Sequence, residues 1–345
     1  MASNTLLALA ILAGIAAAMI PPCLPQLGPE FCPSTAAAAA MSKWPAASVA
    51  YPKEMHQETV LRDLVFPRIL KDRMYNETKG LTNQEKYYMT YPNRHCESRF
   101  GAKVKDWVGY DAFHSLEDAF SNSSHIVSYS SIPNGTPQQS LIIKFLPQGN
   151  WNRSNDIIVI GAHVDSINLR SVLDGVPLDE MIAPGADDNA SGFVGAEEIG
   201  LVGSTAVFDS FRNESRLVKA VLNLDMVGYS GGHEPGSPVI GVHANHTNAN
   251  LTSFTKNIIE TYSNAKAADI ACAYRCSDHA SAWDNGFPSA GIGESAFQEG
   301  REMYPYIHTA NDTIDHLDFD YMVEFAKVSA AFVAELAYTK FAELN

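Results

Sequence analysis

Hydrophobic residues along this chain fall into short apolar runs and into longer segments with helical spacing. The runs predict strands at residues 126–129, 141–145, 157–160, 218–225, 239–242 and 289–294. The helical spacing predicts helices over residues 56–70, 99–112, 250–262 and 319–338. Strands that alternate with helices are typical of α/β proteins, so we expect a three-layer α/β/α sandwich with a mixed central sheet.

Two parts of this pattern predict particular positions in the fold. The turn signal Pro133-Asn134-Gly135 separates the first two runs and predicts a hairpin at a sheet edge. The run Ile157-Ile158-Val159-Ile160 is uniformly apolar, which predicts a buried parallel strand in the centre of the sheet. Residues 168–184 contain Pro and Gly and are expected to form a loop over the rim of a site.

The N-terminal segment has the pattern of an export signal. The first twenty residues carry no charge, and their apolar run from Leu6 to Ile20 is shorter than the roughly 20 residues of a membrane span. We therefore expect residues 1–20 to be a signal peptide, with a signal anchor as the alternative because no basic residues precede the run. Residues 21–55 are expected to be a leader or pro-segment, and residues 56–345 one catalytic domain.

Sequons support an exported protein, and the net charge limits its partners. We expect secretion to the extracellular space, with the vacuole as the alternative destination. The formal net charge of −15 argues against nucleic acid and anionic membranes as partners. Nine N-x-Ser/Thr triplets are typical of a glycoprotein; they begin at Asn76, Asn122, Asn134, Asn152, Asn189, Asn213, Asn245, Asn250 and Asn311. Asn189 and Asn311 lie in candidate site segments, and we expect these two to be unglycosylated.

Five cysteines are present: Cys23, Cys32, Cys96, Cys272 and Cys276. Cys272 and Cys276 close a very short loop, and in an exported chain we expect them to form a disulfide. Two free thiols would require a reducing compartment, and no second cysteine pair accompanies them to form a zinc site. Cys96 has no evident partner and is expected to be buried as a small hydrophobic residue.

Polar side chains with metal affinity follow the predicted strands. His163 and Asp165 come after residues 157–160, Asp225 ends residues 218–225, and His308 lies in a later loop. Because the carboxyl ends of parallel strands share one rim, we expect these groups to converge there. Imidazoles together with carboxylates are a zinc-type ligand set.

Asp187 and the adjacent pair Glu197-Glu198 complete the candidate set. Asp187 is a natural bridging ligand, because the preceding Gly185-Ala186 lets the backbone approach closely. Adjacent Glu197 and Glu198 point in different directions, so one can bind metal while the other acts as a general base. Asp165 lies two residues beyond His163 and is placed to orient its imidazole.

Six motifs, in order, resemble peptidase family M28, a family of zinc aminopeptidases, and in particular the secreted fungal leucine aminopeptidases and bacterial leucyl aminopeptidase. They are His163-Val-Asp-Ser, Gly185-Ala-Asp-Asp-Asn-Ala-Ser-Gly192, Glu197-Glu-Ile-Gly-Leu-Val-Gly-Ser204, Asp225-Met226, Cys272-Ala-Tyr-Arg-Cys-Ser-Asp-His279 and Ile307-His-Thr-Ala-Asn-Asp-Thr313. The resemblance implies a metalloexopeptidase that removes large apolar N-terminal residues from peptides. We also expect a monomer with no membrane association after leader removal.

The resemblance assigns a role to each candidate residue. Asp187 would bridge two zinc ions, His163 and Asp225 would complete one site, and Glu198 and His308 the other. Glu197 would be the general base and Asp165 the partner of His163. A pocket for the first substrate side chain would be lined by Met226, Tyr274, Phe297, Tyr304 and Ile307, with the Cys272–Cys276 disulfide shaping its wall. Ordinary core packing is the alternative for these pocket residues.

The chain departs from the family between two of these motifs. Only nine residues separate Asp187 from Glu197, whereas the family has a helix and a parallel strand there. We therefore expect the core to lack one helix–strand unit between Gly192 and Glu197, although nine to ten residues still span up to about 30 Å. The explanations are a skipped exon, which we favour, an inactive splice form or decayed copy, or an active enzyme with a repaired sheet.

Two rival functions follow. A zinc-dependent glutaminyl cyclase shares the fold and one metal site, and a catalytically inactive or truncated homologue would retain only the fold. The short connector from Asp187 to Glu197 favours the second rival, and the intact ligand set argues against it.

Overall fold

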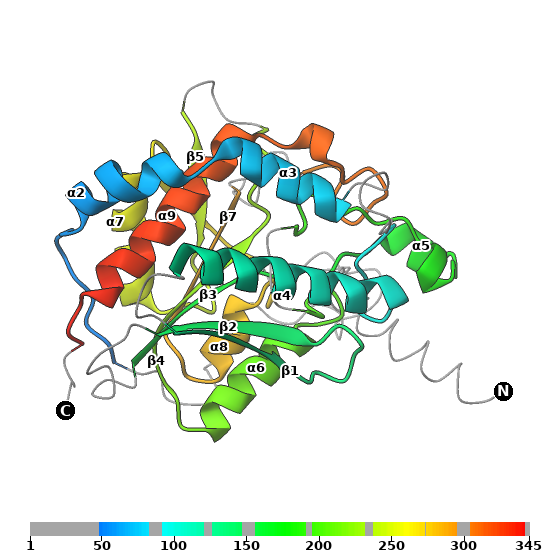
Figure 1. The fold of residues 1–345 in the computed structure, drawn as a ribbon, viewed down its shortest axis with the longest axis horizontal. Helices are drawn as coiled ribbons and strands as arrows, with labels where there is room; N and C mark the ends of the chain where they lie inside the picture. Colours follow the sequence, from blue (N-terminus) through cyan, green and yellow to red (C-terminus); the bar gives the residue numbers. More distant parts are fainter. Residues whose placement is uncertain are drawn as a thin grey trace, which may run out of the picture.

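The computed structural model describes residues 48–82, 92–120, 126–146, 156–190, 195–231, 237–272, 274–294 and 304–341. Its centre is a sheet with helices packed on it (Figure 1). The sheet has five strands in the order β3-β4-β7-β5-β6. The strands are β3 (Asp156–Gly161), β4 (Leu217–Asp225), β5 (Val239–His243), β6 (Lys266–Ile270) and β7 (Ser289–Glu294). β3, β4 and β7 pair in parallel, β5 is antiparallel to β7, and β6 is parallel to β5, so the expected mixed sheet is confirmed.

Helices cover both faces of this sheet. α7 (Ala249–Tyr262) and α9 (Phe319–Ala337) lie on one face, where Leu222 of β4 belongs to the largest buried cluster together with Phe254 and Phe332. α6 (Val202–Asn213) and α8 (His279–Asp284) lie on the other, where Val221 packs in a second cluster with Phe208. Neighbouring residues of β4 thus face opposite layers, as strand geometry requires. The expected three-layer sandwich is confirmed.

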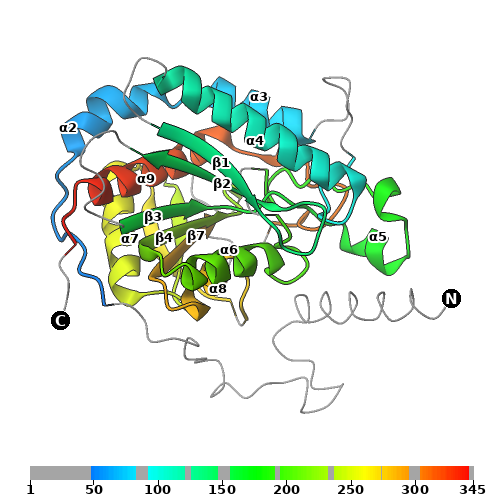
Figure 2. The ribbon, with the colours of Figure 1, turned by 60° about the horizontal axis from the view of Figure 1, so that its bottom comes forward.

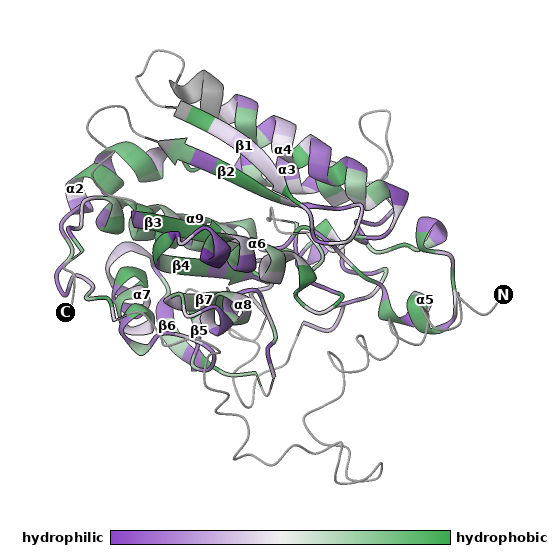
Figure 3. Cartoon of the chain, turned by 90° about the horizontal axis from the view of Figure 1, so that it is seen from below, coloured by the Kyte–Doolittle hydropathy of each residue, from purple (hydrophilic) through white to green (hydrophobic). Residues whose placement is uncertain are grey.

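The predicted hairpin forms a sheet of its own. β1 (Ile126–Ile132) and β2 (Ser140–Leu146) pair antiparallel, and α4 (Arg99–Phe120) packs against them. Figures 2 and 3 show the hairpin lying along the β3 side of the large sheet. No pairing between β2 and β3 is found in the described residues, so the hairpin is separate rather than an edge of the main sheet.

β3 is an edge strand, so the prediction that Ile157-Ile158-Val159-Ile160 lies buried in the sheet centre is wrong. All four side chains are at least partly accessible, and Ile160 is 39% exposed. The physical reason is the short connector, because the described residues between Asp187 and Glu197 contain no helix or strand. The structure therefore agrees with the expected loss of one helix–strand unit.

The region before α4 differs from the sequence prediction. The single helix expected over residues 56–70 is a series of short turns, α2 (Glu58–Val60), η3 (Leu61–Val65) and η4 (Phe66–Arg68), followed by α3 (Lys71–Thr82). Pro67, which has no backbone N–H, lies in the last of these turns.

Residues 48–55, assigned above to the leader, pack on the domain: Tyr51 stacks on Phe254 and its hydroxyl donates to the carbonyl oxygen of Lys219. The folded unit thus extends back at least to residue 48.

Several smaller features complete the fold. The segment 168–184, predicted as loop, contains the short helices α5 (Leu169–Leu173) and η6 (Leu178–Glu180), and η8 (Ile314–His316) precedes α9. Within the described parts of the chain, no helix combines the length and apolar character needed to cross a membrane. The expected signal peptide, most of the leader, Cys23, Cys32, Asn122, Asn152 and Phe297 lie outside the described residues.

Two sequons differ in accessibility. Asn189 is buried and its Nδ2 donates to the carbonyl oxygen of Leu224 at 3.1 Å, so it has no room for a glycan. Asn311 is exposed, and the expectation that it is unglycosylated stays a prediction.

Candidate metal centre and its support

The first pair of candidate ligands lies at the ends of two neighbouring parallel strands. His163 follows the end of β3 by two residues, and Asp225 is the last residue of β4. The strands pair with Gly161 opposite Asn223, which brings their carboxyl ends to one rim. Nε2 of His163 lies 3.2 Å from Oδ1 of Asp225. The sequence therefore placed these two groups correctly at the rim of the sheet.

Asp188 lies between the two candidate imidazoles. Its Oδ1 is 3.1 Å from Nε2 of His163, and its Oδ2 is 2.8 Å from Nε2 of His308. Nε2 of His308 is also 3.0 Å from Oε2 of Glu198. One carboxylate thus contacts both halves of the cluster, which is the position that a bridging ligand must take.

Asp187 does not occupy that position, so the bridging role expected for it is corrected to Asp188. Oδ1 of Asp187 instead accepts a hydrogen bond from the backbone N–H of Gly228 at 2.6 Å. Its carboxylate also contacts Glu294, where burial and the nearby Asp187 raise the pKa of Glu294 to about 12 and keep that carboxyl protonated. The side chains of successive residues in the turn point in different directions. The sequence motif alone therefore does not predict which of the two aspartates faces the histidines.

Asp312 holds the turn that carries the two aspartates. Its Oδ1 accepts the N–H of Asp187 at 2.9 Å, and its Oδ2 accepts the N–H of Asp188 at 3.1 Å. The hydroxyl of Tyr304 donates to Oδ1 of Asp312 at 2.9 Å. Because Asp312 follows His308 by four residues, this contact ties the aspartate turn to the loop that carries the second imidazole.

Asp165 supports both the first imidazole and the end of the short connector. Its Oδ1 lies 3.5 Å from Nδ1 of His163, in agreement with the expected orienting role. The same carboxylate accepts the backbone N–H groups of Glu197 and Glu198, each at 3.0 Å. A single buried side chain therefore positions three residues of the candidate centre.

The carboxylates of the cluster carry more negative charge than its two histidines can neutralise. Burial alone would lower the pKa of His163, but the nearby carboxylates, Asp225 first among them, outweigh burial and raise it well above its usual value. The pKa of His308 is raised in the same way by Glu198 and Asp188. Burial raises the pKa of Glu198 to about 7 and that of Glu197 well above the usual range. These shifts are those expected of a site built for cations.

The donor set fits zinc. His163, Asp188 and Glu198 offer ligand atoms that all lie within 4.8 Å of one another, and Asp225 and His308 contact the same group. Oε1 of Glu198 is buried and has no hydrogen-bond partner among the described residues. Imidazole nitrogens and carboxylate oxygens are the ligands that Zn²⁺ takes in hydrolytic sites. The residues present therefore meet the chemical requirement for the metal.

Arg94, which no sequence motif identifies, is fully buried beside the candidate centre. Its Nε donates to the carbonyl oxygen of Val164 at 2.8 Å, and its two terminal nitrogens donate to the carbonyl oxygens of Pro184 and Gly185. One guanidinium thus joins the segment after β3 to the segment before the aspartates. No motif surrounds Arg94, so only its contacts in the fold reveal this role.

Replacing Arg94 by methionine should lower the free energy of unfolding by about 3 kcal/mol or more, because three buried carbonyl groups lose a charged donor. Chemical denaturation monitored by circular dichroism measures this change. The same substitution at Arg99, whose side chain is 66% exposed, is the matched control and should change stability by less than about 0.5 kcal/mol. Equal effects of the two substitutions would contradict the assigned role.

Gly185 confirms the expected close approach of the backbone. Its φ is +56°, and an added Cβ would lie 2.5 Å from Cβ of Ser166 and 2.6 Å from the carbonyl oxygen of Asp188. Any other residue would push the aspartate turn away from the histidines.

The residues expected to line a substrate pocket divide into two groups. Tyr274 is 45% exposed, and burial with the charges of Glu197 and Asp225 raises its pKa to about 12, so its ring lies near the acidic centre. Ile307 is partly accessible beside His308. Met226 and Tyr304 are buried, and the Tyr304 hydroxyl donates to Asp312; core packing agrees with this burial, and their pocket role stays a prediction. Phe297 lies outside the described residues.

The cysteines agree with the sequence prediction. Cys272 and Cys276 form a disulfide, and Cys96 is a buried free thiol. The loop between the two bonded cysteines carries Tyr274, so the disulfide lies beside the acidic centre.

Comparison with known proteins shows similarity over most of the chain. Residues 192–333 match the profile of peptidase family M28. The probable leucine aminopeptidase 1 of Trichophyton verrucosum is 34% identical over 321 residues, which cover 84% of this chain and 80% of that protein. Leucine aminopeptidase 1 of Fusarium vanettenii is 33% identical over 86% of this chain and 78% of its own length. The solved LapA aminopeptidase of Legionella pneumophila has a TM-score of 0.70 at 27% identity, with 83% of this chain and 76% of that chain covered.

Proposed function

The chain belongs to peptidase family M28 and is an aminopeptidase of the metalloexopeptidase class, and from this premise we propose that it uses two zinc ions to release leucine-like residues from the N-termini of peptides. The observation that carries the proposal is the contact of Asp188 with both His163 and His308. Asp225 on one side and Glu198 on the other complete two ligand groups that share one carboxylate. Two such groups fit a pair of metal ions.

Different residues of this chain would have different roles in hydrolysis. Zinc, when bound, would supply Lewis acidity and would make water acidic near neutral pH. His163, Asp188, Asp225, Glu198 and His308 would hold the cations. The carboxylate of Glu197, whose backbone Asp165 fixes, would accept a proton from the attacking water and pass it to the leaving amine nitrogen.

The expected substrate class rests on the names of the relatives and on the rim of the site. The curated relatives are leucine aminopeptidases, and Tyr274 and Ile307 place an aromatic and an aliphatic side chain beside the ligands. A site with this lining favours a large apolar first residue over a charged one.

We also propose that the enzyme is secreted, which the charge-free apolar start of the chain, the sequons and the disulfide support. Expression in a eukaryotic secreting host should give protein in the medium that a glycosidase shifts in mass. Retention of all the protein in the cells would contradict secretion.

The activity is tested with the full 345-residue chain and leucyl, alanyl and lysyl chromogenic amides. We expect leucyl amide to be cleaved fastest, a chelator to abolish turnover, and zinc to restore it at two equivalents per chain. A peptide with N-terminal glutamine distinguishes the rival enzyme, because a cyclase forms pyroglutamate and an aminopeptidase releases free glutamine. Soluble, folded protein without any turnover would support the inactive homologue.

Replacing Glu197 by glutamine should lower kcat for leucyl amide by about a hundredfold to a thousandfold and leave the bound zinc unchanged, because glutamine cannot accept the proton. Metal analysis and steady-state kinetics measure the two quantities. The exposed Glu180, replaced in the same way, is the control and should retain full activity. A variant at Glu197 that loses zinc would instead be missing a ligand.

A further inference from the structure

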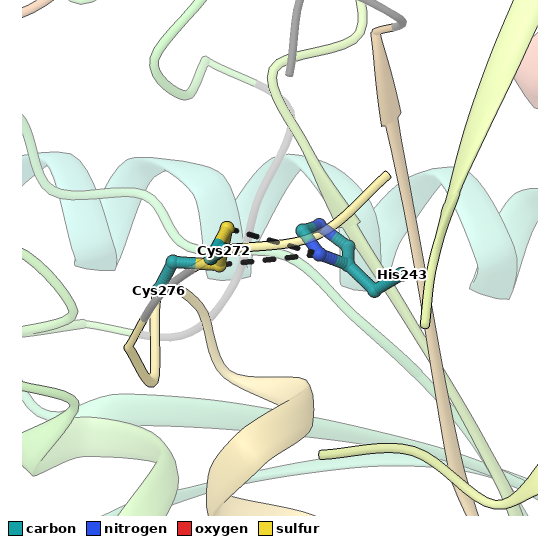
Figure 4. A group of neighbouring side chains, drawn as sticks. All are labelled: His243, Cys272 and Cys276. Atoms are coloured by element: carbon teal, nitrogen blue, oxygen red, sulfur yellow. Dashed lines mark hydrogen bonds between the residues drawn. A yellow bond between two sulfur atoms is a disulfide. The ribbon is translucent and has the colours of Figure 1, made fainter. Parts of the chain in front are cut away.

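A second group of metal-binding side chains lies apart from the candidate centre, where β5 and β6 end; these two strands run opposite to β3, β4 and β7. His243 ends β5, and Cys272 follows β6 by two residues. The two strands are parallel, with His243 opposite Ile270, so their carboxyl ends lie together. Nδ1 of His243 is 3.9 Å from Sγ of Cys272 and 3.9 Å from Sγ of Cys276 (Figure 4).

The surroundings keep these donors in place and out of water. The ring of His243 is 3% exposed and stacks on the ring of His279, with 4.5 Å between centroids. Oδ1 of Asn245 accepts the backbone N–H of Cys272, and Nδ2 of Asn245 donates to the carbonyl oxygen of Cys272. Burial lowers the pKa of His243 to about 4, so its imidazole is neutral. A neutral imidazole is the form that ligates metal.

The distances are close to those of a metal site with two thiolates and one imidazole. Tetrahedral Zn²⁺ with usual bond lengths holds nitrogen about 3.6 Å from sulfur and two sulfurs about 3.8 Å apart. The nitrogen to sulfur distances of 3.9 Å already approach the first value. Only the two sulfurs must separate, and the spacing Cys-x₃-Cys is within the range that zinc sites use.

We propose that Cys272, Cys276 and His243 form a site for a thiophilic divalent cation such as Zn²⁺ once the disulfide is reduced. A dithiol reductant supplies two electrons and two protons, the sulfur–sulfur bond breaks, and the dithiol becomes a cyclic disulfide. Binding of the cation then displaces both thiol protons to solvent, and water takes the fourth position. His243 supplies the third protein ligand that the cysteine pair alone lacks.

The site would act on the aminopeptidase through Tyr274. This residue lies between the two cysteines and its ring is near the acidic centre. Moving the sulfurs apart around a cation would widen the loop that carries Tyr274. That consequence rests on the proposed function, whereas the metal site itself does not.

The test uses the full chain with Cys23, Cys32 and Cys96 replaced by serine, so that only the bonded pair can supply thiolates. The protein is freed of metal, reduced with a phosphine, which takes oxygen from water to become the phosphine oxide, and titrated with Co²⁺. Thiolate ligation gives Co²⁺ an intense near-ultraviolet charge-transfer band, whereas the nitrogen and oxygen ligands of the candidate centre do not. We expect this band at one equivalent in reduced protein, none in oxidised protein, and its loss on addition of Zn²⁺.

Two further variants identify the ligands. Replacing Cys276 by serine should abolish the band, and replacing His243 by glutamine should weaken Co²⁺ binding by at least about tenfold. Near-ultraviolet circular dichroism reports whether each reduced protein keeps its packing. Absence of the band in reduced, folded protein would overturn the proposal, as would unfolding on reduction or an unchanged band in the His243 variant.

Discussion

Replacing Asp188 by asparagine should lower leucyl amide hydrolysis by more than about ten-thousandfold and should release the bound zinc. Among the described residues, Asp188 is the carboxylate that contacts both His163 and His308, so its loss removes a ligand from both metal positions. Without the metal, the pKa of the attacking water is not lowered, and the negative charge that develops on the carbonyl oxygen is not stabilised. Steady-state kinetics with metal analysis of the purified variant measure both effects.

The matched control is the same substitution at the neighbouring Asp187. Asparagine can still accept the N–H of Gly228 through its side-chain oxygen, and Asp187 does not contact either histidine of the cluster. We expect this variant to keep its zinc and to lose much less activity. If the Asp187 variant loses the metal and the Asp188 variant keeps it, the assignment drawn from the geometry is reversed.

Asp187 and Asp188 show which part of the candidate centre the sequence alone does not predict. The histidines, Asp225 and the two glutamates are found from sequence because each follows a strand or lies in a recognisable motif. The choice between Asp187 and Asp188 depends on how one turn is oriented, and that orientation is set by Asp312 and by Arg94. Both of these residues are distant in sequence, and Arg94 belongs to no motif, so local pattern could not reveal the contacts.

In the fold, too, some elements are predicted by the local sequence pattern, whereas others depend on contacts between distant segments. The strands β4, β5 and β7 and the helices α7 and α9 follow from apolar periodicity, because their side chains face a continuous core. The sequence pattern does not predict β6, α3, α6 or α8, and the helix expected before α3 is broken into short turns where Pro67 removes a donor. The expected central strand β3 is at an edge because a neighbour is lacking, which the run of four apolar residues alone cannot show.

The candidate centre assembles despite the short connector for a reason visible in its contacts. A helix and strand that leave the rim and return to it begin and end near the same place, so their loss need not move the ligands on either side. Asp165 fixes the connector end by accepting the N–H groups of Glu197 and Glu198, and Nδ2 of Asn134 donates to the carbonyl oxygen of Gly195 at 3.3 Å. The missing helix–strand unit therefore removes a strand from the sheet but does not separate the metal ligands.

Inserting a helix–strand unit of the family between Gly192 and Glu197 should therefore raise the free energy of unfolding by at least about 3 kcal/mol, with a smaller effect on kcat. The added strand would pair with the free edge of β3 and cover its partly exposed apolar side chains, including Ile160. For a chain of this size the midpoint of thermal unfolding should rise by at least about 4 °C, and aggregation through the open edge should fall.

The control for this insertion is a Gly/Ser linker of equal length at the same point, which adds chain without a strand to pair. Linker insertion should leave stability unchanged or lower it, because a longer flexible loop costs closure entropy. Differential scanning calorimetry and light scattering on the three proteins measure the outcome. If the linker and the helix–strand unit give the same stability, the edge of β3 is already satisfied and the sheet has closed by contacts with the hairpin β1–β2.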